Sequence, residues 1–296
     1  MSIQAHIIKA VTRRTIKRNG LDQEQLVRHL RRVFNSTPTL TLMPRGVRLR
    51  QVDQPAFRGD HVSVRDPQVT VLYLHGGAYI GGVTKTYHNL AGRLATQLAG
   101  EVYLATYPFA PEHPFPAAVN RVLEAYEYLL SLGKSPRDIV IAGDSAGGGL
   151  TLATLLHLRD KKLPQPRCAV TFSPGCSCLP DDSILAALDP SDAMLSADII
   201  RTVIDIYVPD PQDRKHPYAS PGLADYTGLC PLMITASTDE VLYGDAKLAR
   251  QAAQKAGVKV EWLERSGVFH VWPIMVPFLP EARKDVKQVV DFIQAQ

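Results

Sequence analysis

The chain has 296 residues, a length that fits one α/β domain with an added segment better than two independent domains. Its residues are 45% hydrophobic and 21% charged, which is ordinary for a globular protein with a large core. The 33 lysines and arginines stand against 29 aspartates and glutamates, a balance that argues against a nucleic-acid-binding protein.

The first 35 residues predict two helices. Gly20 provides a stop for the first helix, and Asp22 provides a cap for the second. The basic N-terminus lacks the long apolar core and the cleavage site of a signal peptide, and no apolar run in the chain approaches the roughly 18 residues of a membrane span. We therefore expect these helices to pack on their own protein, without stable membrane association. An amphipathic helix that binds a membrane surface is the alternative.

Strands dominate from about residue 47 onward. Residues 47–53 and 61–66 alternate apolar and polar side chains, which predicts antiparallel or edge strands. Residues 69–77, VTVLYLHGG, form a continuous apolar run that ends in glycines and is typical of a buried strand. Strands and helices then alternate: strands at 101–107, 138–144, 168–175, 231–237 and 258–266, and helices at 115–132, 146–160, 242–257 and 281–294. This alternation predicts an α/β fold, with a mostly parallel sheet flanked by helices on both faces.

One segment interrupts the alternation. Residues 181–220 contain helical patches and several prolines and are too long for an ordinary loop, so they predict an inserted cap. The expected organisation is then a pair of N-terminal cap helices over 1–45 and a catalytic domain over 46–180 and 221–296, with the cap segment inserted between its two parts.

The cysteines show no spacing typical of a zinc site or of a disulfide framework; they are Cys168, Cys176, Cys178 and Cys230. Unpaired cysteines of this kind favour a reduced protein, and we expect a cytoplasmic location.

The stretch IVIAGDSAGGGL, residues 139–150, carries the strongest candidate site. It contains the pattern G-x-S-x-G as Gly143, Ser145 and Gly147, after a buried strand and at the start of a helix. This is the setting of a nucleophile elbow, in which the serine takes a strained conformation and small neighbours avoid collisions. The helix N-terminus also stabilises a developing oxyanion. The structural alternative is a strand-to-helix turn that merely contains a serine.

A serine nucleophile needs a base and an orienting acid, in the chain order serine, acid, histidine on this architecture. His270 is the only one of nine histidines beyond the last predicted strand, so it is the expected base. The acid should follow the preceding strand, where Asp239 comes first and is the expected residue, with Glu240 as the second choice. Taken singly, Asp239 as a helix cap and His270 as an ordinary loop histidine are the alternatives. Together, the three residues at three strand ends favour a catalytic triad.

The glycine-rich stretch HGGAYIGG, residues 75–82, follows the buried strand at the place of an oxyanion loop. We expect the N–H groups of Gly76 and Gly77, with the N–H of Ala146, to form the oxyanion hole. A phosphate-binding loop is the alternative, which the lack of a lysine and of G-x-G-x-x-G spacing disfavours. His75 is expected to brace this loop and not to act as the base.

With these residues assigned, the sequence resembles the bacterial hormone-sensitive-lipase-like esterases, family IV of the α/β-hydrolase superfamily. The matching motifs lie in the family's order: HGGAY at 75–79, YPFAPEHPFPAA at 107–118, GDSAGGGL at 143–150, TDE at 238–240 and FHVW at 269–272. STDEVL followed by FHVWP also resembles the monoterpene lactone hydrolase branch. The chain departs from the family where many members have H-G-G-G, Arg-Leu before Ala-Pro-Glu, and asparagine in place of Gly149.

The resemblance implies an α/β-hydrolase fold with a helical cap built from both cap segments, and it suggests homodimers formed through the last strand. It also implies acyl transfer to water: Ser145 attacks the ester carbonyl, His270 takes its proton and Asp239 orients the imidazole, with no metal or cofactor. A small-molecule ester is the expected substrate. An amidase or formamidase with the same triad is one alternative, and a non-catalytic ligand receptor on the same fold is another, although such a receptor would be expected to have lost a triad member.

The cap also bears on substrate size. A bounded pocket favours ligands that it can enclose, so we expect esters with acyl chains of about two to eight carbons, or lactones, to be preferred over long triglycerides. Tyr79, just past the oxyanion glycines, and Tyr207, in the insertion, are the expected substrate-binding residues.

Overall fold

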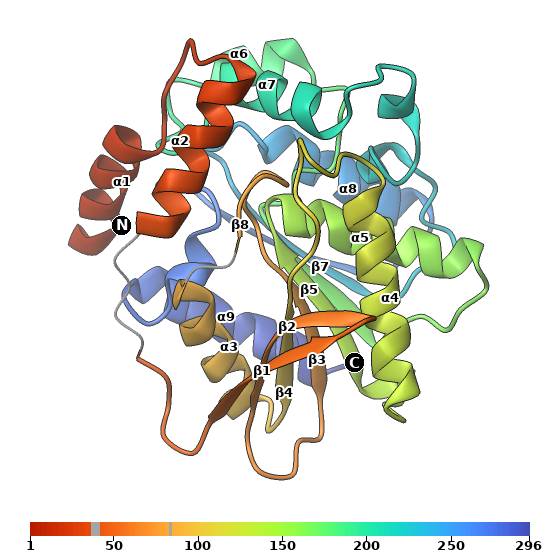
Figure 1. Ribbon diagram of the computed structural model, residues 1–296. Coiled ribbons are helices and arrows are strands. Elements are labelled where there is room, and N and C mark those ends of the chain that lie inside the picture. The colour runs from red at the N-terminus through yellow and green to blue at the C-terminus, as the bar shows by residue number, and fades with distance from the viewer. Residues whose placement is uncertain (37–41, 83–84) are drawn as a thin grey trace.

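The computed structural model describes residues 1–36, 42–82 and 85–296. Within these ranges eight strands form one sheet, in the order β1-β2-β4-β3-β5-β6-β7-β8 (Figure 1). Their bounds are β1 (Arg48–Gln54), β2 (Phe57–Ser63), β3 (Thr70–Leu74), β4 (Glu101–Ala105), β5 (Ile139–Asp144), β6 (Cys168–Phe172), β7 (Leu232–Ser237) and β8 (Val260–Arg265). β2 pairs antiparallel with β1 and β4, and every other neighbouring pair is parallel. The predicted antiparallel edge and mostly parallel sheet are confirmed.

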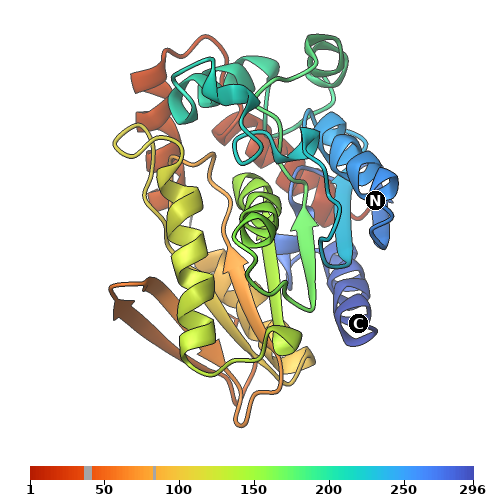
Figure 2. The same ribbon diagram turned by 90° about the vertical axis from the view of Figure 1, so that its right-hand side faces the viewer.

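Helices cover the sheet on both faces, as Figures 1 and 2 show. One face holds α3 (Lys85–Gln97) and α9 (Pro280–Gln294), and the other holds α4 (Ala117–Ser131), α5 (Ala146–Asp160) and α8 (Tyr243–Lys255). Successive side chains of β3 enter opposite cores, Val71 and Tyr73 on the α3 side and Leu72 and Leu74 on the α5 side. Because both faces are covered, β3 and β5 are buried along their whole length, which explains their continuous apolar sequences.

Four helices lie beyond the carboxyl ends of the parallel strands (Figures 1 and 2): α1 (Ile3–Thr15), α2 (Gln23–Ser36), α6 (Asp182–Leu188) and α7 (Ala197–Tyr207). Leu26 and Leu30 of α2 share an apolar cluster with Ile199 and Val203 of α7. The two segments predicted as a cap are thus neighbours in space, although far apart in sequence. The domain boundaries stay a prediction, and residues 37–41 of the first segment lie outside the described residues.

Side-chain caps explain where several of these helices begin. The Ser2 hydroxyl accepts a hydrogen bond from the Ala5 N–H at 3.2 Å, and the Asp22 carboxylate accepts one from the Gln25 N–H at 2.8 Å. Gly20, at φ 72°, turns the chain between α1 and α2. It does not stop the first helix as predicted, because α1 already ends at Thr15. The remaining short turns are 3₁₀ helices: η1 (Pro136–Asp138), η2 (Asp213–Lys215), η3 (Pro221–Leu223) and η4 (Trp272–Met275).

Two expectations concern the surface of the protein: the lack of stable membrane association and a homodimer through the last strand. No helix in the described ranges combines the length and the apolar content that crossing a bilayer requires. β8 ends the sheet and pairs only with β7 among the described residues. It is the last strand, through which a homodimer is expected, and that expectation stays a prediction.

Candidate active site

Ser145 occupies a tight turn between β5 and α5. Its backbone lies at φ 52° and ψ −120°, a conformation that non-glycine residues rarely adopt. A Cβ atom on Gly143 would come within 2.3 Å of the Gly147 carbonyl oxygen, and one on Gly147 would come within 2.0 Å of the Leu74 carbonyl oxygen. The two glycines of the motif are therefore required by the close approach of backbone on both sides of the serine. The turn has the geometry expected of a nucleophile elbow.

His270 links this serine to an acid. Its Nε2 lies 2.9 Å from the Ser145 Oγ, and its Nδ1 lies 2.5 Å from the Glu240 Oε2. The other oxygen of Glu240 accepts the Ser237 N–H at 2.8 Å, which fixes the carboxylate at the end of β7. When Nδ1 donates its proton to Glu240, Nε2 is left free to accept the serine hydroxyl proton. The described structure thus joins the ends of β5, β7 and β8 in one hydrogen-bonded chain.

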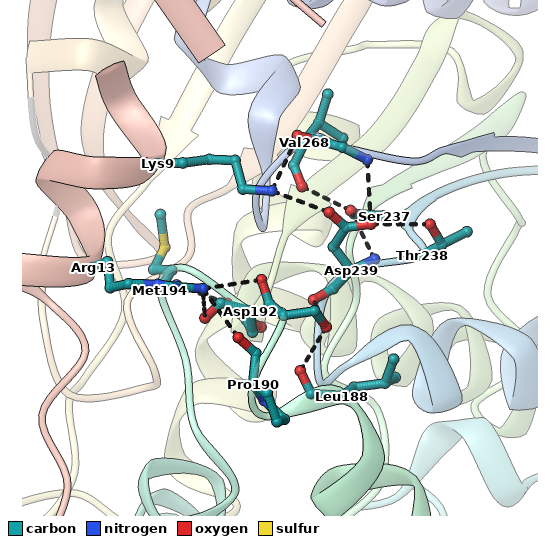
Figure 3. Close-up of polar contacts among 12 residues, drawn as sticks. Lys9, Arg13, Leu188, Pro190, Asp192, Met194, Ser237, Thr238, Asp239 and Val268 are labelled. Carbon is teal, nitrogen blue, oxygen red and sulfur yellow. Dashed lines mark hydrogen bonds and ion pairs between the residues drawn. The ribbon is translucent and has the colours of Figure 1, made fainter. Parts of the chain in front are cut away.

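The structure places Glu240 beside His270, in the position expected of Asp239. Asp239 points away from His270, toward α1, where its Oδ2 lies 3.0 Å from the Lys9 Nζ (Figure 3). Its Oδ1 accepts the Gly267 N–H at 3.2 Å. The chain turns directly after β7, and adjacent side chains in that turn leave in different directions. The order of the two acids in the sequence therefore carries no information about which one faces His270.

The surroundings of His270 favour its charged form. Burial alone would lower its pKa, but the hydrogen bond and the charge of Glu240 outweigh this effect, with further help from the charges of Asp192 and Asp144, so the pKa is raised above its ordinary value. Both His270 and Glu240 are almost completely buried. A buried carboxylate opposite a buried imidazole is the arrangement that stabilises an imidazolium formed by proton transfer.

The oxyanion loop differs from expectation at Gly76. The Gly76 N–H donates to the Asp144 carboxylate and to the Tyr87 hydroxyl, both at 3.0 Å, so it is not directed at a substrate. Gly77, Ala78 and Ala146 have N–H groups without a hydrogen-bond partner in the part of the chain that the structure describes. The available pair of donors on the loop is therefore shifted by one residue, from Gly76 and Gly77 to Gly77 and Ala78. Ala78 is a donor that the sequence analysis missed.

Asp144 causes this difference, because its carboxylate accepts the Gly76 N–H. Its carboxylate accepts hydrogen bonds from the hydroxyls of Tyr73 at 3.0 Å and Tyr87 at 2.9 Å, besides the Gly76 N–H. Burial raises the pKa of Asp144 to about 6, although these three donors oppose the rise. The sequence analysis assigned no role to Asp144, although its place as a charged residue at the end of a fully buried strand could have indicated one.

His75 braces the base of the loop, as expected. Its Nδ1 lies 2.6 Å from the Gly76 carbonyl oxygen, and its ring stacks on Tyr107 with the ring centres 4.4 Å apart. The Tyr107 hydroxyl donates to the His75 carbonyl oxygen at 2.7 Å. Burial lowers the pKa of His75 to about 4, so this imidazole is neutral near pH 7.

Two cavities reach Ser145. The larger, about 340 Å³, lies under the cap and is lined by Ser145, His270 and apolar side chains of α1, α2 and the segment 269–275. The smaller, about 60 Å³, is lined by Ser145 and Ala146 and also by both expected substrate-binding residues, Tyr79 and Tyr207. These two tyrosines stack with their ring centres 3.6 Å apart. All four cysteines are free buried thiols, and no described group of His, Cys, Asp and Glu side chains is arranged to hold a metal ion.

Comparison with known proteins identifies the family of the chain. Residues 71–274 match the family described as the alpha/beta hydrolase fold. The chain is 38% identical over 225 residues to an acetyl-hydrolase from Streptomyces hygroscopicus, covering 76% of this chain and 75% of that one. It is 30% identical over 262 residues to an esterase from Acinetobacter venetianus, covering 88% of this chain and 84% of that one.

A solved structure of an esterase from the bacterial hormone-sensitive lipase family superposes with a TM-score of 0.89 and 26% identity, covering 100% of this chain and 99% of that one. The chain belongs to the α/β-hydrolase fold family, in its hormone-sensitive-lipase-type esterase group. The predictions of the fold, of this family and of a carboxylic ester hydrolase are confirmed.

Proposed function

We propose that the protein hydrolyses carboxylic esters of small molecules through an acyl-enzyme, with Ser145 as nucleophile, His270 as general base and Glu240 as the orienting acid. The continuous hydrogen-bonded chain from Ser145 through His270 to Glu240, next to unpartnered N–H groups, is the observation that carries this proposal. Glu240 takes the role first expected of Asp239.

Each group has one task in the reaction. His270 removes the Ser145 hydroxyl proton as Oγ attacks the ester carbonyl, and Glu240 stabilises the resulting imidazolium. The N–H groups of Gly77, Ala78 and Ala146 are the donors for the oxyanion. The imidazolium then protonates the leaving alcohol, and water, deprotonated by His270, releases the acid from Ser145.

The cavity under the cap supports the expected substrate range of about two to eight acyl carbons, with lactones as cyclic esters that the same chemistry opens. Each methylene adds about 0.8 kcal/mol of binding only while apolar wall remains to bury it. Across p-nitrophenyl esters from acetate to palmitate, kcat/KM should therefore reach its maximum at eight carbons or fewer and then fall. A maximum at fourteen carbons or beyond, or activation at an oil–water interface, would indicate a true lipase. A matched p-nitroanilide should react far more slowly, and the opposite order would indicate an amidase.

The pH dependence follows from the environment of His270. The imidazole must be neutral to accept a proton, and Glu240 raises its pKa, so activity should rise with pH with a midpoint above the ordinary value of 6.5. The measurement is kcat/KM against pH with an uncharged substrate. A His270→Ala variant that keeps a near-normal rate would remove His270 from the mechanism.

The N-terminal helices are proposed to form part of the lid. α1 is tied to the rest of the protein by three cations, shown in part in Figure 3. Lys9 binds Asp239 and the Gly267 carbonyl oxygen, Arg13 donates to the Pro190 carbonyl oxygen at 3.1 Å, and Lys17 lies 2.8 Å from Asp189.

Deleting residues 1–36 should lower kcat/KM and expose apolar surface, because α1 and α2 line the larger cavity. A Lys9→Ala/Arg13→Ala/Lys17→Ala variant should show the same direction of change. An Arg14→Ala/Arg18→Ala variant is the matched control, since these exposed cations make no hydrogen bond or ion pair with side chains of the described residues. Dye binding and kinetics report the two effects, and a soluble truncated protein with unchanged kinetics would mean that the segment is no lid.

A further inference from the structure

The inserted segment contacts the backbone on both sides of Glu240. Directly after Glu240, the Val241 N–H donates to the Asp192 Oδ2 at 2.9 Å. Directly before it, the Asp239 carbonyl oxygen lies 2.9 Å from the Ser191 hydroxyl. Figure 3 shows Asp192 next to the turn that holds Asp239. Two adjacent residues between α6 and α7 therefore support the turn that carries the proposed acid.

The carboxylate of Asp192 is buried and is held by backbone N–H groups. Asp192 is 1% exposed, and its Oδ1 accepts the N–H groups of Met194 at 2.7 Å and Leu195 at 2.9 Å. The nearby Lys17 of α1 donates to the Asp192 carbonyl oxygen at 3.0 Å, and its ion pair is with the carboxylate of Asp189. A buried carboxylate costs free energy that neutral hydrogen-bond donors offset only in part.

Local structure alone does not explain the charge at this position. The contacts with Met194 and Leu195 form a turn in which a side-chain oxygen accepts N–H groups two and three residues further on. An asparagine makes the same turn without a charge. The contact with Val241 is different, because it spans 49 residues of sequence and needs a second acceptor oxygen. A carboxylate provides both oxygens, whereas an amide provides one.

The negative charge of Asp192 acts on His270. Burial lowers the pKa of His270, and three carboxylates raise it, those of Glu240, Asp192 and Asp144. Glu240 contacts the imidazole directly, and Asp144 binds the oxyanion loop through the Gly76 N–H. In the proposed mechanism the imidazole becomes an imidazolium, and a fixed charge in buried surroundings stabilises this cation more than the same charge in water would.

The same carboxylate also joins the acid turn to the wall of the substrate cavity. Met194 and Leu195, whose N–H groups it accepts, line the larger cavity beside Ser145. Leu195 lines the smaller cavity as well. One buried side chain of the cap thus fixes both the cavity wall and the backbone next to the proposed acid.

We propose that Asp192 is a positioning residue of the catalytic centre: it holds the Glu240 turn through the Val241 N–H, and its charge stabilises the imidazolium form of His270. This inference rests on the proposed function and adds to the same site a residue of the inserted segment. The insertion then supports the reaction itself, besides covering the cavity.

An Asp192→Asn variant tests this role. The amide oxygen can keep the turn with Met194 and Leu195, whereas the amide nitrogen replaces the acceptor of the Val241 N–H and the charge is lost. We expect kcat for p-nitrophenyl acetate to fall about tenfold or more, with KM within about threefold of the native value. The loss of a negative charge lowers the pKa of His270, so the midpoint of kcat/KM against pH should move to lower pH by about half a unit or more.

Asp182→Asn is the matched control in the same inserted segment. Asp182 pairs with Arg201 at 2.8 Å, and its side chain is 75% exposed, so we expect native kcat and a native midpoint for this variant. If Asp192→Asn behaved like Asp182→Asn, the inference would be wrong and the esterase function would stand. A fall in kcat with an unchanged midpoint would also overturn it, because a purely structural support does not move the midpoint.

Thermal melting shows whether each variant is folded. If Asp192→Asn does not fold, Asp192→Ser is the second neutral variant, because a serine hydroxyl also accepts N–H groups of a following turn. The same fall in kcat and the same shift of the midpoint are expected. Unfolding of both variants would show that Asp192 serves the fold alone and would overturn the inference. Failure of the native protein to hydrolyse p-nitrophenyl acetate would instead overturn the proposed function.

Discussion

Replacing Ser145 by alanine should reduce kcat for a p-nitrophenyl ester by roughly 10³-fold or more while the protein remains folded. The hydroxyl makes one hydrogen bond, to His270, and the alanine side chain fits the same turn. Binding and the oxyanion donors remain in the variant, so the loss measures the nucleophile with its base. Thermal melting verifies the fold, and single-turnover kinetics exclude a defect in product release.

A serine-directed phosphonate adds a direct measurement. It should label the native protein once, at Ser145, and abolish ester hydrolysis in proportion to labelling. Ser131→Ala is the control, because Ser131 lies exposed at the end of α4, far from His270 in sequence and outside both cavities. Labelling at another residue with activity retained would contradict the assignment of the nucleophile.

Replacing Glu240 by glutamine should lower kcat by roughly 10³- to 10⁴-fold, whereas Asp239→Asn should stay within about tenfold of the native rate. The glutamine is neutral and cannot stabilise an imidazolium, and its amide can also donate to Nδ1 and favour the wrong tautomer of His270. Asp239→Asn removes the ion pair with Lys9. The side chains of Lys9 and Asp239 are 20% and 24% exposed, so this pair is partly in contact with solvent. Steady-state kinetics on the two variants separate neighbouring residues that the sequence does not distinguish.

The pH profile provides an independent readout for the same pair. Glu240 raises the pKa of His270 against the lowering effect of burial, so its neutralisation should move the midpoint of the residual activity to lower pH. Asp239→Asn should leave the midpoint in place, because Asp239 is not among the groups that shift this pKa. If Asp239→Asn were the inactive variant, Asp239 would be the acid as first expected.

The sequence predicted those parts of the site that depend on local backbone constraints. Gly143 and Gly147 mark the elbow because the neighbouring backbone comes too close for any side chain, and this requirement appears directly as a motif. The parallel sheet was predictable from continuous apolar strands that alternate with helices. His270 was identified by elimination, since no other histidine follows the last strand.

The sequence could not predict which neighbouring group faces the site. Asp239 and Glu240 leave one turn in different directions: Glu240 contacts His270, and Asp239 contacts Lys9 of α1 across more than two hundred residues of sequence. The Gly76 N–H is taken by the Asp144 carboxylate, a tertiary contact that moves the available donors toward Ala78. Tyr79 and Tyr207 were both expected near the substrate, but their stacking depends on the packing of the insertion.

The attachment of α1 also affects how often the N-terminal helix detaches from the rest of the protein. The contacts of Lys9 reach the loops that hold Glu240 and His270, so the order of the N-terminal helix and the order of these loops are thermodynamically linked. Ion pairs with partly exposed partners contribute roughly 0–1 kcal/mol each, far less than the packed sheet beneath them. Detachment of α1 is therefore a local opening with a free energy well below that of global unfolding. If α1 forms part of the lid as proposed, we expect the product to leave through such openings, so that the contacts of Lys9, Arg13 and Lys17 influence its residence time.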